Sequence, residues 1–390
     1  MAAPPEYTWE CMAPEVPFAP RDGAEMVALN GRLFVLGGWN QFSDEAHRGA
    51  GVGNFDSEVC SEVWVSDDSG KHWTQLPDAP WEGRHYFGLV VHDSMIWIVG
   101  GDNSSGPYQT DIWNSPDGKE WTQVLAQAPW PERALHMVCV FDGSIWVMGG
   151  QTNAPAQTRF IDGTADQFES EETAVLRDVW RTNDGANWER VTDSAPWAPR
   201  GMITGANGGV AVHRGRMWIL GGGYVGKNGV TLSSLKYDQE LEPRYEEREY
   251  YNDIWSSADG KEWTLELAEA PWCTRHYHDV AVFDEKLWIL GGAFCRAATP
   301  EEVGTDGNMN DVWYSEDGLD WAQLPGTPWS LRHACGVFSI LSDGLYMTGG
   351  NTVTFFDEER DRTPADGAAN PNVVQGQYKT NSVWRPFGAF

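Results

Sequence analysis

The sequence of 390 residues predicts an all-β protein in which six four-stranded sheets close into a ring, the architecture of a six-bladed β-propeller. Three observations support this prediction. An apolar run ending in Gly-Gly recurs six times, a strand motif ending in Trp follows each run, and the strand that the last repeat lacks stands near the N-terminus. Because repeats of this size spread one fold over a long chain, we expect a single domain over residues 1–390.

The first half of each repeat is typical of a β-hairpin. Apolar runs such as RLFVLGG and KLWILGG precede the Gly-Gly, and upstream runs such as MVCVFDG join them through polar turns such as Asn30-Gly31 and Asp142-Gly143. Such dipeptides supply the positive φ that a tight hairpin needs. The Gly-Gly pairs begin at Gly37, Gly100, Gly149, Gly221, Gly291 and Gly349.

The second half of each repeat also recurs. The motifs EVW, DIW, DVW, DIW, DVW and SVW end at Trp64, Trp113, Trp180, Trp255, Trp313 and Trp384. Five of them continue into a turn and another Trp, as in SDDSGKHW, SPDGKEW, TNDGANW, SADGKEW and SEDGLDW. The turn residues predict a second hairpin, in which the Asp side chain can bond the turn backbone.

The sixth repeat stops after Trp384 without a partner strand, and the segment YTWECM around Trp9 can supply it. An N-terminal strand that completes the last sheet favours a closed ring over an open solenoid. The predicted blades span residues 21–76, 84–125, 133–191, 200–266, 275–324, and 332–384 together with 7–11.

Gly-Gly after an apolar strand, followed by paired aromatics, resembles the pattern of the Kelch family of β-propellers. The turn SDDSGKHW also resembles the Asp-box of sialidase-type propellers, S-x-D-x-G-x-x-W, and the other four turns are one residue shorter. The Kelch resemblance implies that the linkers before the first strands and the loops after Gly-Gly share one face, on which ligands commonly bind. Bacterial sialic-acid mutarotases offer an analogy at the level of the fold, a free-standing Kelch ring with an acidic sugar ligand.

Charge excludes some classes of partner. The chain has 57 Asp and Glu against 27 Lys and Arg, a net charge of −30, and such a surface repels nucleic acid and anionic membranes. The N-terminus lacks the pattern of a signal peptide, and no apolar run is long enough to span a membrane, so we expect a cytoplasmic protein. The six Cys include no CxxC pair, which predicts reduced thiols, although Cys273 and Cys295 can approach each other.

Each repeat carries an Arg in the linker before its first strand, and we expect these side chains to form a ring at the mouth of the central channel. They are Arg21, Arg84, Arg133, Arg200, Arg275 and Arg332, and the fourth linker contains an inserted ITGANGG. Guanidinium groups in such a ring suit an anionic ligand through bidentate bonds. The alternative is structural, with each Arg tying its blade to a neighbour through backbone carbonyls.

Some of these linkers also contain His and Tyr, as in the RHYH that begins at Arg275. His85, His276, Tyr277 and His278 are candidate catalytic groups, with an Arg neutralising an acid while His or Tyr transfers a proton. Tyr86 also lies in this set, with His136 and His333 beside their own arginines. A divalent metal held by two or three His is a second possibility, and hydrogen-bonded structural His is a third. No other cofactor is evident.

Polar and aromatic residues follow the Gly-Gly pairs and are expected at the same mouth. The candidate ligand-binding residues there are Trp39, Asn103, Gln151, Tyr224 and Asn351. The predicted function is binding of a small anionic or polyhydroxylated ligand, with isomerase or lyase chemistry if the protein is an enzyme. The alternative is a non-catalytic scaffold whose long loops after Gly-Gly clasp a protein or peptide.

Overall fold

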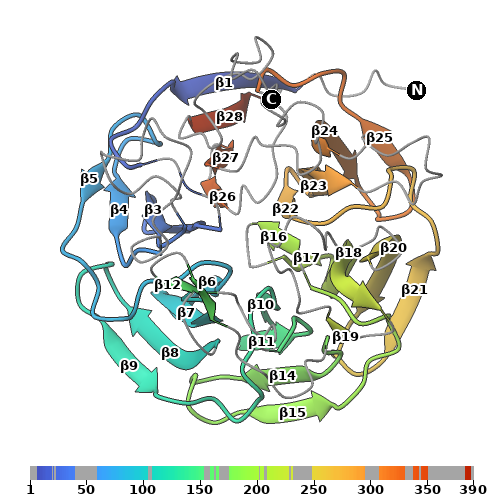
Figure 1. Cartoon of the computed structure of the whole chain (residues 1–390). Helices are drawn as coiled ribbons and strands as arrows, with labels where there is room; N and C mark the ends of the chain where they lie inside the picture. Colours follow the sequence, from blue (N-terminus) through green and yellow to red (C-terminus); the bar gives the residue numbers. More distant parts are fainter. Residues whose placement is uncertain are drawn as a thin grey trace, which may run out of the picture.

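A computed structural model of the chain describes most of the core of the fold. The described residues are 7–19, 21, 23–39, 59–103, 108–152, 159–161, 164–166, 175–201, 203–205, 209–227, 230–231, 248–294, 307–329, 337–341, 344–349 and 383–387. Within them the chain is an all-β propeller built from four-stranded sheets arranged around a ring (Figure 1). The described residues include no helix of the length and apolarity needed to cross a bilayer.

In the described part of the chain, six sheets have four or five strands, and we number them in chain order. The first contains β2 (Glu25–Leu29), β3 (Arg32–Leu36), β4 (Val63–Ser66) and β5 (Thr74–Gln75). The second contains β6 (Gly88–His92), β7 (Met95–Gly101), β8 (Gln109–Ser115) and β9 (Thr122–Leu125). The third contains β10 (Met137–Phe141), β11 (Ser144–Met148), β14 (Val179–Thr182) and β15 (Glu189–Thr192).

The later sheets carry additions to the same plan. The fourth contains β17 (Ala211–His213), β18 (Arg216–Lys227), β20 (Arg248–Ser257) and β21 (Trp263–Leu267), with β19 (Val230–Thr231) paired to β18. The fifth contains β22 (His278–Phe283), β23 (Lys286–Phe294), β24 (Gly307–Ser315) and β25 (Trp321–Gln323), with β16 (Ile203–Gly205) added beside β22. A separate two-stranded sheet contains β12 (Arg159–Ile161) and β13 (Thr164–Asp166).

The sixth sheet joins the two ends of the fold. It contains β26 (Val337–Leu341), β27 (Gly344–Thr348), β28 (Val383–Phe387) and β1 (Thr8–Ala13). β1 and β28 are antiparallel, with Trp9 opposite Pro386 and Cys11 opposite Trp384. The predicted completion of the last sheet by the N-terminal strand is therefore confirmed, and it leaves this sheet with its outer strand in place on the rim of the ring (Figure 1).

The turns follow the predicted chemistry. Asn30 and Gly31 have φ of 52° and 78°, and Asp142 and Gly143 have φ of 47° and 68°. These values belong to the left-handed region that two-residue hairpin loops require. The strands that they join are buried on both faces, as in β3, where four of five residues are buried, because each sheet packs between two neighbours.

The Asp-Gly turns between the third and fourth strands also lock neighbouring sheets together. In the second sheet, Ser115 Oγ accepts a hydrogen bond from the Gly118 N–H at 2.8 Å, and Trp121 Nε1 donates to the Gly118 carbonyl at 3.1 Å. The corresponding glycine of the fourth sheet, Gly260, lies against the Trp146 ring of the third, so close that a Cβ would stand 2.2 Å from Trp146 Cζ3. The turn motif is therefore a contact between sheets.

The Gly-Gly pairs make a second contact of this kind. Gly38 N–H donates to the Arg84 carbonyl at 2.9 Å, and Gly150 N–H donates to the Arg200 carbonyl at 2.9 Å, in each case in the linker of the following sheet. Gly37 has a φ of 59°, and a Cβ there would lie 2.7 Å from the Arg84 carbonyl oxygen. Glycine is needed because the backbones approach too closely for any side chain. The insertion in the fourth linker adds strand β16, which runs parallel to β22.

Candidate functional site

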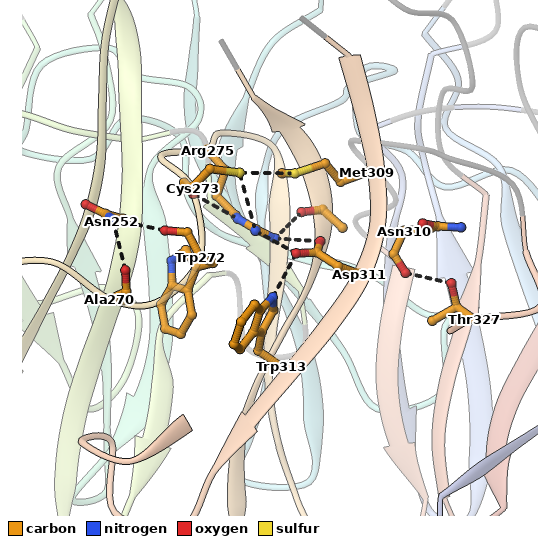
Figure 2. A network of polar contacts seen from close by, with 11 residues as sticks. Asn252, Ala270, Trp272, Cys273, Arg275, Met309, Asn310, Asp311, Trp313 and Thr327 are labelled. Atoms are coloured by element: carbon orange, nitrogen blue, oxygen red, sulfur yellow. Dashed lines mark hydrogen bonds and ion pairs between the residues drawn. The ribbon is translucent and has the colours of Figure 1, made fainter. Parts of the chain in front are cut away.

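The linker arginines are bound by carboxylates of the protein. Figure 2 shows the arrangement in the fifth sheet: Arg275 Nη1 and Nη2 donate to the two Asp311 carboxylate oxygens at 3.0 and 2.9 Å. Arg275 Nη1 also donates to the Gly291 carbonyl at 3.0 Å, and Trp313 Nε1 donates to Asp311 Oδ2 at 2.8 Å. The carboxylate of the D-V-W motif thus accepts from the linker Arg and from the Trp of its own strand, and the Arg in turn bonds the first glycine of Gly-Gly.

Four other sheets repeat this network. The pairs are Arg21 with Glu62, Arg84 with Asp111, Arg133 with Asp178, and Arg200 with Asp253. The five arginines are between 0% and 3% exposed. Burial raises the pKa of the Asp178 carboxyl, but the hydrogen bonds and charge of Arg133 outweigh it, so its pKa lies below the usual value.

The structure therefore favours the structural interpretation of these five arginines over the interpretation as ligand anchors. Each guanidinium is buried, and its N–H groups donate to a carboxylate and to carbonyls of the protein itself. It is therefore poorly placed to bind a ligand. The structural alternative predicted backbone carbonyls as the partners of these arginines. In the structure, a carboxylate also binds each guanidinium. Arg332 and His333 lie outside the described residues.

His136 and His278 occupy equivalent positions, three residues after Arg133 and Arg275. Both are buried, and His278 Nε2 donates to the Leu220 carbonyl at 2.7 Å. Burial, with a smaller contribution from the neighbouring arginine, lowers the pKa of each imidazole to about 3. His278 is thus a neutral group of the fold, and we leave it out of the proposed proton-transfer groups.

The most unusual feature lies two residues after the linker arginines. Tyr86 and Tyr277 have φ of 50° and 51°, and Leu135, at the equivalent position of the third linker, has a φ of 56°. The first linker places a glycine there, Gly23, with a φ of 57°. Left-handed backbone is costly for residues with a Cβ, and aromatic side chains held in it commonly mark functional sites.

The two strained tyrosines meet across the ring. Their rings stack with centroids 5.5 Å apart and an interplanar angle of 20°. Tyr86 leads into β6 and Tyr277 precedes β22, and these two inner strands lie on opposite sides of the ring centre (Figure 1). The linker backbones also bond in series, since Tyr86 N–H donates to the Gly23 carbonyl at 3.1 Å and Leu135 N–H to the Tyr86 carbonyl at 3.3 Å.

Other aromatic rings extend this stack. His85 lies against Tyr86 at 4.3 Å and is followed by Trp39 at 6.3 Å, between ring centroids. On the other side His276 lies 4.8 Å from Tyr277 and stacks on Tyr250 at 4.3 Å and 10°. We call these six residues, Trp39, His85, Tyr86, Tyr250, His276 and Tyr277, the mouth cluster.

The mouth cluster brings predicted candidates together. His85, His276, Tyr277 and Trp39, which come from the first, second and fifth repeats, are adjacent as expected. Tyr86, Tyr250 and Tyr277 are partly buried and pack against a small buried group formed by Tyr108, Ala134 and Leu135. The cluster therefore has a buried base and contains four partly exposed aromatic residues, Trp39, Tyr86, Tyr250 and Tyr277.

His85 has a defined tautomer. Its Nδ1 lies 2.9 Å from the Asp102 carbonyl oxygen, which can only accept, so Nδ1 carries the proton and donates. In the neutral ring Nε2 then carries the lone pair, and it lies 3.7 Å from Asp102 Oδ2.

The remaining predicted ligand-binding residues differ in their distance from the mouth cluster and in their burial. Gln151 Nε2 donates to the Tyr108 hydroxyl at 3.2 Å, beside the mouth cluster, and Asn103 Nδ2 donates to Glu82 at 2.9 Å. Tyr224 is only 1% exposed and belongs to the interior of the fourth sheet. Asn351 lies outside the described residues, as do most of the long loops after Gly-Gly.

Tyr250 and Tyr108 were not among the predicted candidates. Tyr250 precedes the D-I-W motif of the fourth sheet and Tyr108 that of the second. Both stand three residues before the Asp of D-I-W, so this position carries Tyr in the second and fourth repeats, a shared feature that could have indicated them. In the part of the chain that the structure describes, no group of three or more His, Cys, Asp or Glu is arranged to hold a metal ion.

A scan against known protein families finds no match for this chain, and a search of curated proteins finds no similar sequence. Solved structures with the same fold do exist. One of them, titled "Structure of YjhT", aligns with a TM-score of 0.58 over 89% of this chain and 94% of its own, at 14% sequence identity. At this identity the likeness shows the fold, a β-propeller, and the function has to be argued from the site.

Proposed function

We propose that the chain is a six-bladed Kelch-type propeller that binds a small polyhydroxylated ligand at the mouth cluster. Support for the blade assignment comes from the six sheets of four or five strands among the described residues and from the six Gly-Gly pairs in the sequence. Under this assignment each of these sheets is one blade. The single domain over 1–390, the cytoplasmic location, and the exclusion of nucleic acid and membranes remain predictions.

The observation that carries the ligand proposal is the pair of strained, stacked tyrosines. A protein that needed only a turn at these positions could use glycine, as the first linker does at Gly23, at no conformational cost. Tyr86 and Tyr277 instead accept a cost of roughly 1–3 kcal/mol each for left-handed backbone. Both side chains are partly exposed, and we propose that a ring-shaped ligand packs against the exposed part of this stacked pair.

The charges favour a neutral ligand over an anionic one. Five of the linker arginines neutralise the protein's own carboxylates, and the net charge of −30 repels anions. Aromatic faces with amide and hydroxyl groups at their edge, such as those of Gln151 and Tyr108, suit the apolar faces and hydroxyl edges of a sugar. We therefore narrow the anionic or polyhydroxylated class to neutral sugars and similar polyols.

Substitution of the left-handed tyrosines by glycine provides a sharp test. Glycine removes the aromatic ring and adopts the same φ, so Tyr86→Gly and Tyr277→Gly delete the platform without distorting the linker. Leu135→Gly is the matched control, because it makes the same change in the third linker without removing an aromatic ring. A panel of neutral and acidic monosaccharides and disaccharides is screened by saturation-transfer NMR, and binders are measured by calorimetry.

We expect neutral sugars to bind wild type and Leu135→Gly, and about tenfold more weakly to each tyrosine variant, as loss of one stacking partner predicts. Equal binding by all four proteins would refute the mouth cluster as the site. A preference for acidic sugars would overturn the neutral class, and binding of peptides alone would favour the scaffold alternative.

A second candidate function, proton transfer to a bound ligand, rests on the tautomer of His85. Nε2 holds a lone pair with the Asp102 carboxylate 3.7 Å away, so the ring can accept a proton from a ligand and return it, as an isomerase or lyase requires. His85→Asn keeps a donor for the Asp102 carbonyl and removes this base. If any sugar that binds exchanges a carbon-bound proton in D₂O, we expect wild type to catalyse the exchange and His85→Asn to lose it. Exchange at the same rate in His85→Asn would exclude the proposal.

A further inference from the structure

Two sulfur atoms meet beside the Arg275 network. Cys273 Sγ lies 3.5 Å from Met309 Sδ, and Arg275 Nη2 lies 3.8 Å from Cys273 Sγ (Figure 2). Cys273 is an exposed free thiol, while Met309 on β24 is 9% exposed. The pair is therefore reached from solvent through the cysteine, and the thioether forms its inner side.

Comparison of the repeats shows that the fold does not require sulfur here. Cys273 lies two residues before the linker Arg, and Met309 lies two residues before the carboxylate that binds it. The equivalent pairs in the other four described networks are Ala19 and Cys60, Glu82 and Gln109, Pro131 and Leu176, and Ala198 and Tyr251. These two positions thus tolerate apolar, amide, acidic and aromatic side chains, and of the described networks the fifth alone places sulfur at both.

We propose that Cys273 and Met309 form a binding site for a soft monovalent metal ion, of the class of Cu(I) and Ag(I). Thiolate and thioether are the protein ligands that such ions prefer, whereas Mg²⁺ and Ca²⁺ prefer oxygen. Binding replaces the thiol proton: the S–H bond breaks, the proton goes to solvent, and an S–metal bond forms with no change of oxidation state. Met309 adds its lone pair as a second donor.

The surrounding charges are compatible with this chemistry. Arg275 is already paired with Asp311, and a thiolate formed at Cys273 by metal binding cancels the charge of a monovalent ion. A divalent ion would leave a net positive charge beside the buried Arg275, which is unfavourable. The long unbranched side chain of Met309 can adjust to open the two sulfurs around the ion.

Cys60 supplies an internal comparison. It occupies the Met309 position of the first network, with Ala19 at the Cys273 position. Its Sγ accepts from Arg21 Nη1 at 3.0 Å and donates to the Gly37 carbonyl at 3.3 Å, and burial raises the pKa of its thiol. A partly buried, protonated thiol with no second sulfur at the paired position is not expected to bind such an ion.

The test is a competition titration of the full-length protein with Cu(I) under anaerobic conditions, in the presence of a chromogenic Cu(I) chelator. The variants are Cys273→Ser and Met309→Leu, with Cys11→Ser as the control for an exposed thiol and Met95→Leu as the control for a partly buried methionine. Both sulfur substitutions conserve volume, so they preserve the packing. A melting scan of each variant without metal verifies this.

We expect one tight site in wild type and in both controls, loss of that site in Cys273→Ser, and at least tenfold weaker binding in Met309→Leu. Methyl-labelled methionine gives a second readout, in which addition of Ag(I) shifts the Met309 methyl resonance. Unchanged affinity in Met309→Leu with an unmoved methyl signal would overturn the two-sulfur site. Unchanged binding by Cys273→Ser would do the same, by placing the tight site elsewhere in the chain.

Discussion

Tyr86 and Tyr277 stack ring on ring, 5.5 Å apart, although they lie in the linkers before the second and fifth sheets and each has left-handed backbone. Contacts in a propeller mostly join neighbouring sheets. This one joins sheets on opposite sides of the ring centre (Figure 1). The contact therefore couples two linkers that the rest of the fold keeps apart.

We expect Tyr277→Gly to change stability by less than about 1.5 kcal/mol, because relief of left-handed strain offsets the lost stacking. Thermal unfolding followed by circular dichroism measures the effect. Tyr346→Gly in β27, where the side chain is fully buried, is the contrasting substitution and should cost at least about 3 kcal/mol. Similar losses in the two variants would show that Tyr277 is held for packing alone.

Asp178→Asn should destabilise the protein by about 3–5 kcal/mol, because it removes the negative charge that compensates the buried Arg133 guanidinium. The control is Asp193→Asn, which breaks the exposed pair of Arg190 and Asp193 and should change stability by no more than about 1 kcal/mol. Melting temperatures of the two variants are compared with wild type. Equal effects would contradict the structural function that we assign to the buried pairs.

Comparison of Gly260→Ala with Gly143→Ala separates the steric cost of an added Cβ from the conformational cost of left-handed backbone. Gly260 has a φ of 72°, and a Cβ there would lie 2.2 Å from Trp146. Gly143 has a φ of 68° with nothing within 4 Å of a built Cβ. Alanine at 143 should cost about 1 kcal/mol for left-handed backbone, and alanine at 260 should cost about 1–3 kcal/mol more for the collision with the neighbouring sheet. Urea denaturation measures the free energy of unfolding of both variants. Equal losses would contradict the close packing of the Gly260 turn against the Trp146 ring.

Stability should fall in acid before the carboxylates protonate. The pKa of His136 and of His278 is lowered to about 3, below the ordinary value of 6.5, so the unfolded chain binds these protons first. Their contribution is complete above pH 6.5 and is lost as the pH falls toward 3, at about 1.4 kcal/mol per pH unit for each group. His278→Gln keeps a donor for the Leu220 carbonyl and should flatten this slope by one proton between pH 4 and 6. A slope equal to that of wild type would contradict the assignment.

Sequence periodicity was sufficient for the scaffold. The Gly-Gly pairs, the Asp-Gly turns and the motif around Trp9 each have a local chemical reason, and the pairing of Cys11 with Trp384 confirms the closure. The partners of the linker arginines were harder to predict from the sequence, because a repeated residue indicates a shared role but does not identify the residue that it contacts. The signal was available: the carboxylate of Asp111, Asp178, Asp253 and Asp311 recurs two residues before Trp in the same repeats that carry Arg.

Part of the mouth cluster could be predicted from the sequence, and its function stays a proposal. The departure from the repeat at Arg-His-Tyr-His indicated where to look, and His85, His276 and Tyr277 do lie together. All three histidines are buried, and His278 is separated from the other two by complete burial and by the bond of its Nε2 to the Leu220 carbonyl, neither of which can be inferred from spacing along one strand. Gly23 stands at the position equivalent to Tyr86 and Tyr277. A glycine at one copy of a repeated position is a signal for positive φ, and all three residues have it.

The pairing of β1 with β28 has a consequence for how the protein is made. The first four sheets consist of consecutive segments, and the fifth adds only β16 from the linker before the fourth, so these five can assemble while the ribosome is still adding residues. The sixth cannot, because its outer strand β1 precedes the other five sheets in the chain and the neighbouring strand β28 follows them. During synthesis β1 is therefore an unpaired edge, open to pairing with β28 of another nascent chain, and closely spaced ribosomes on one message would favour exchange of this strand between two molecules.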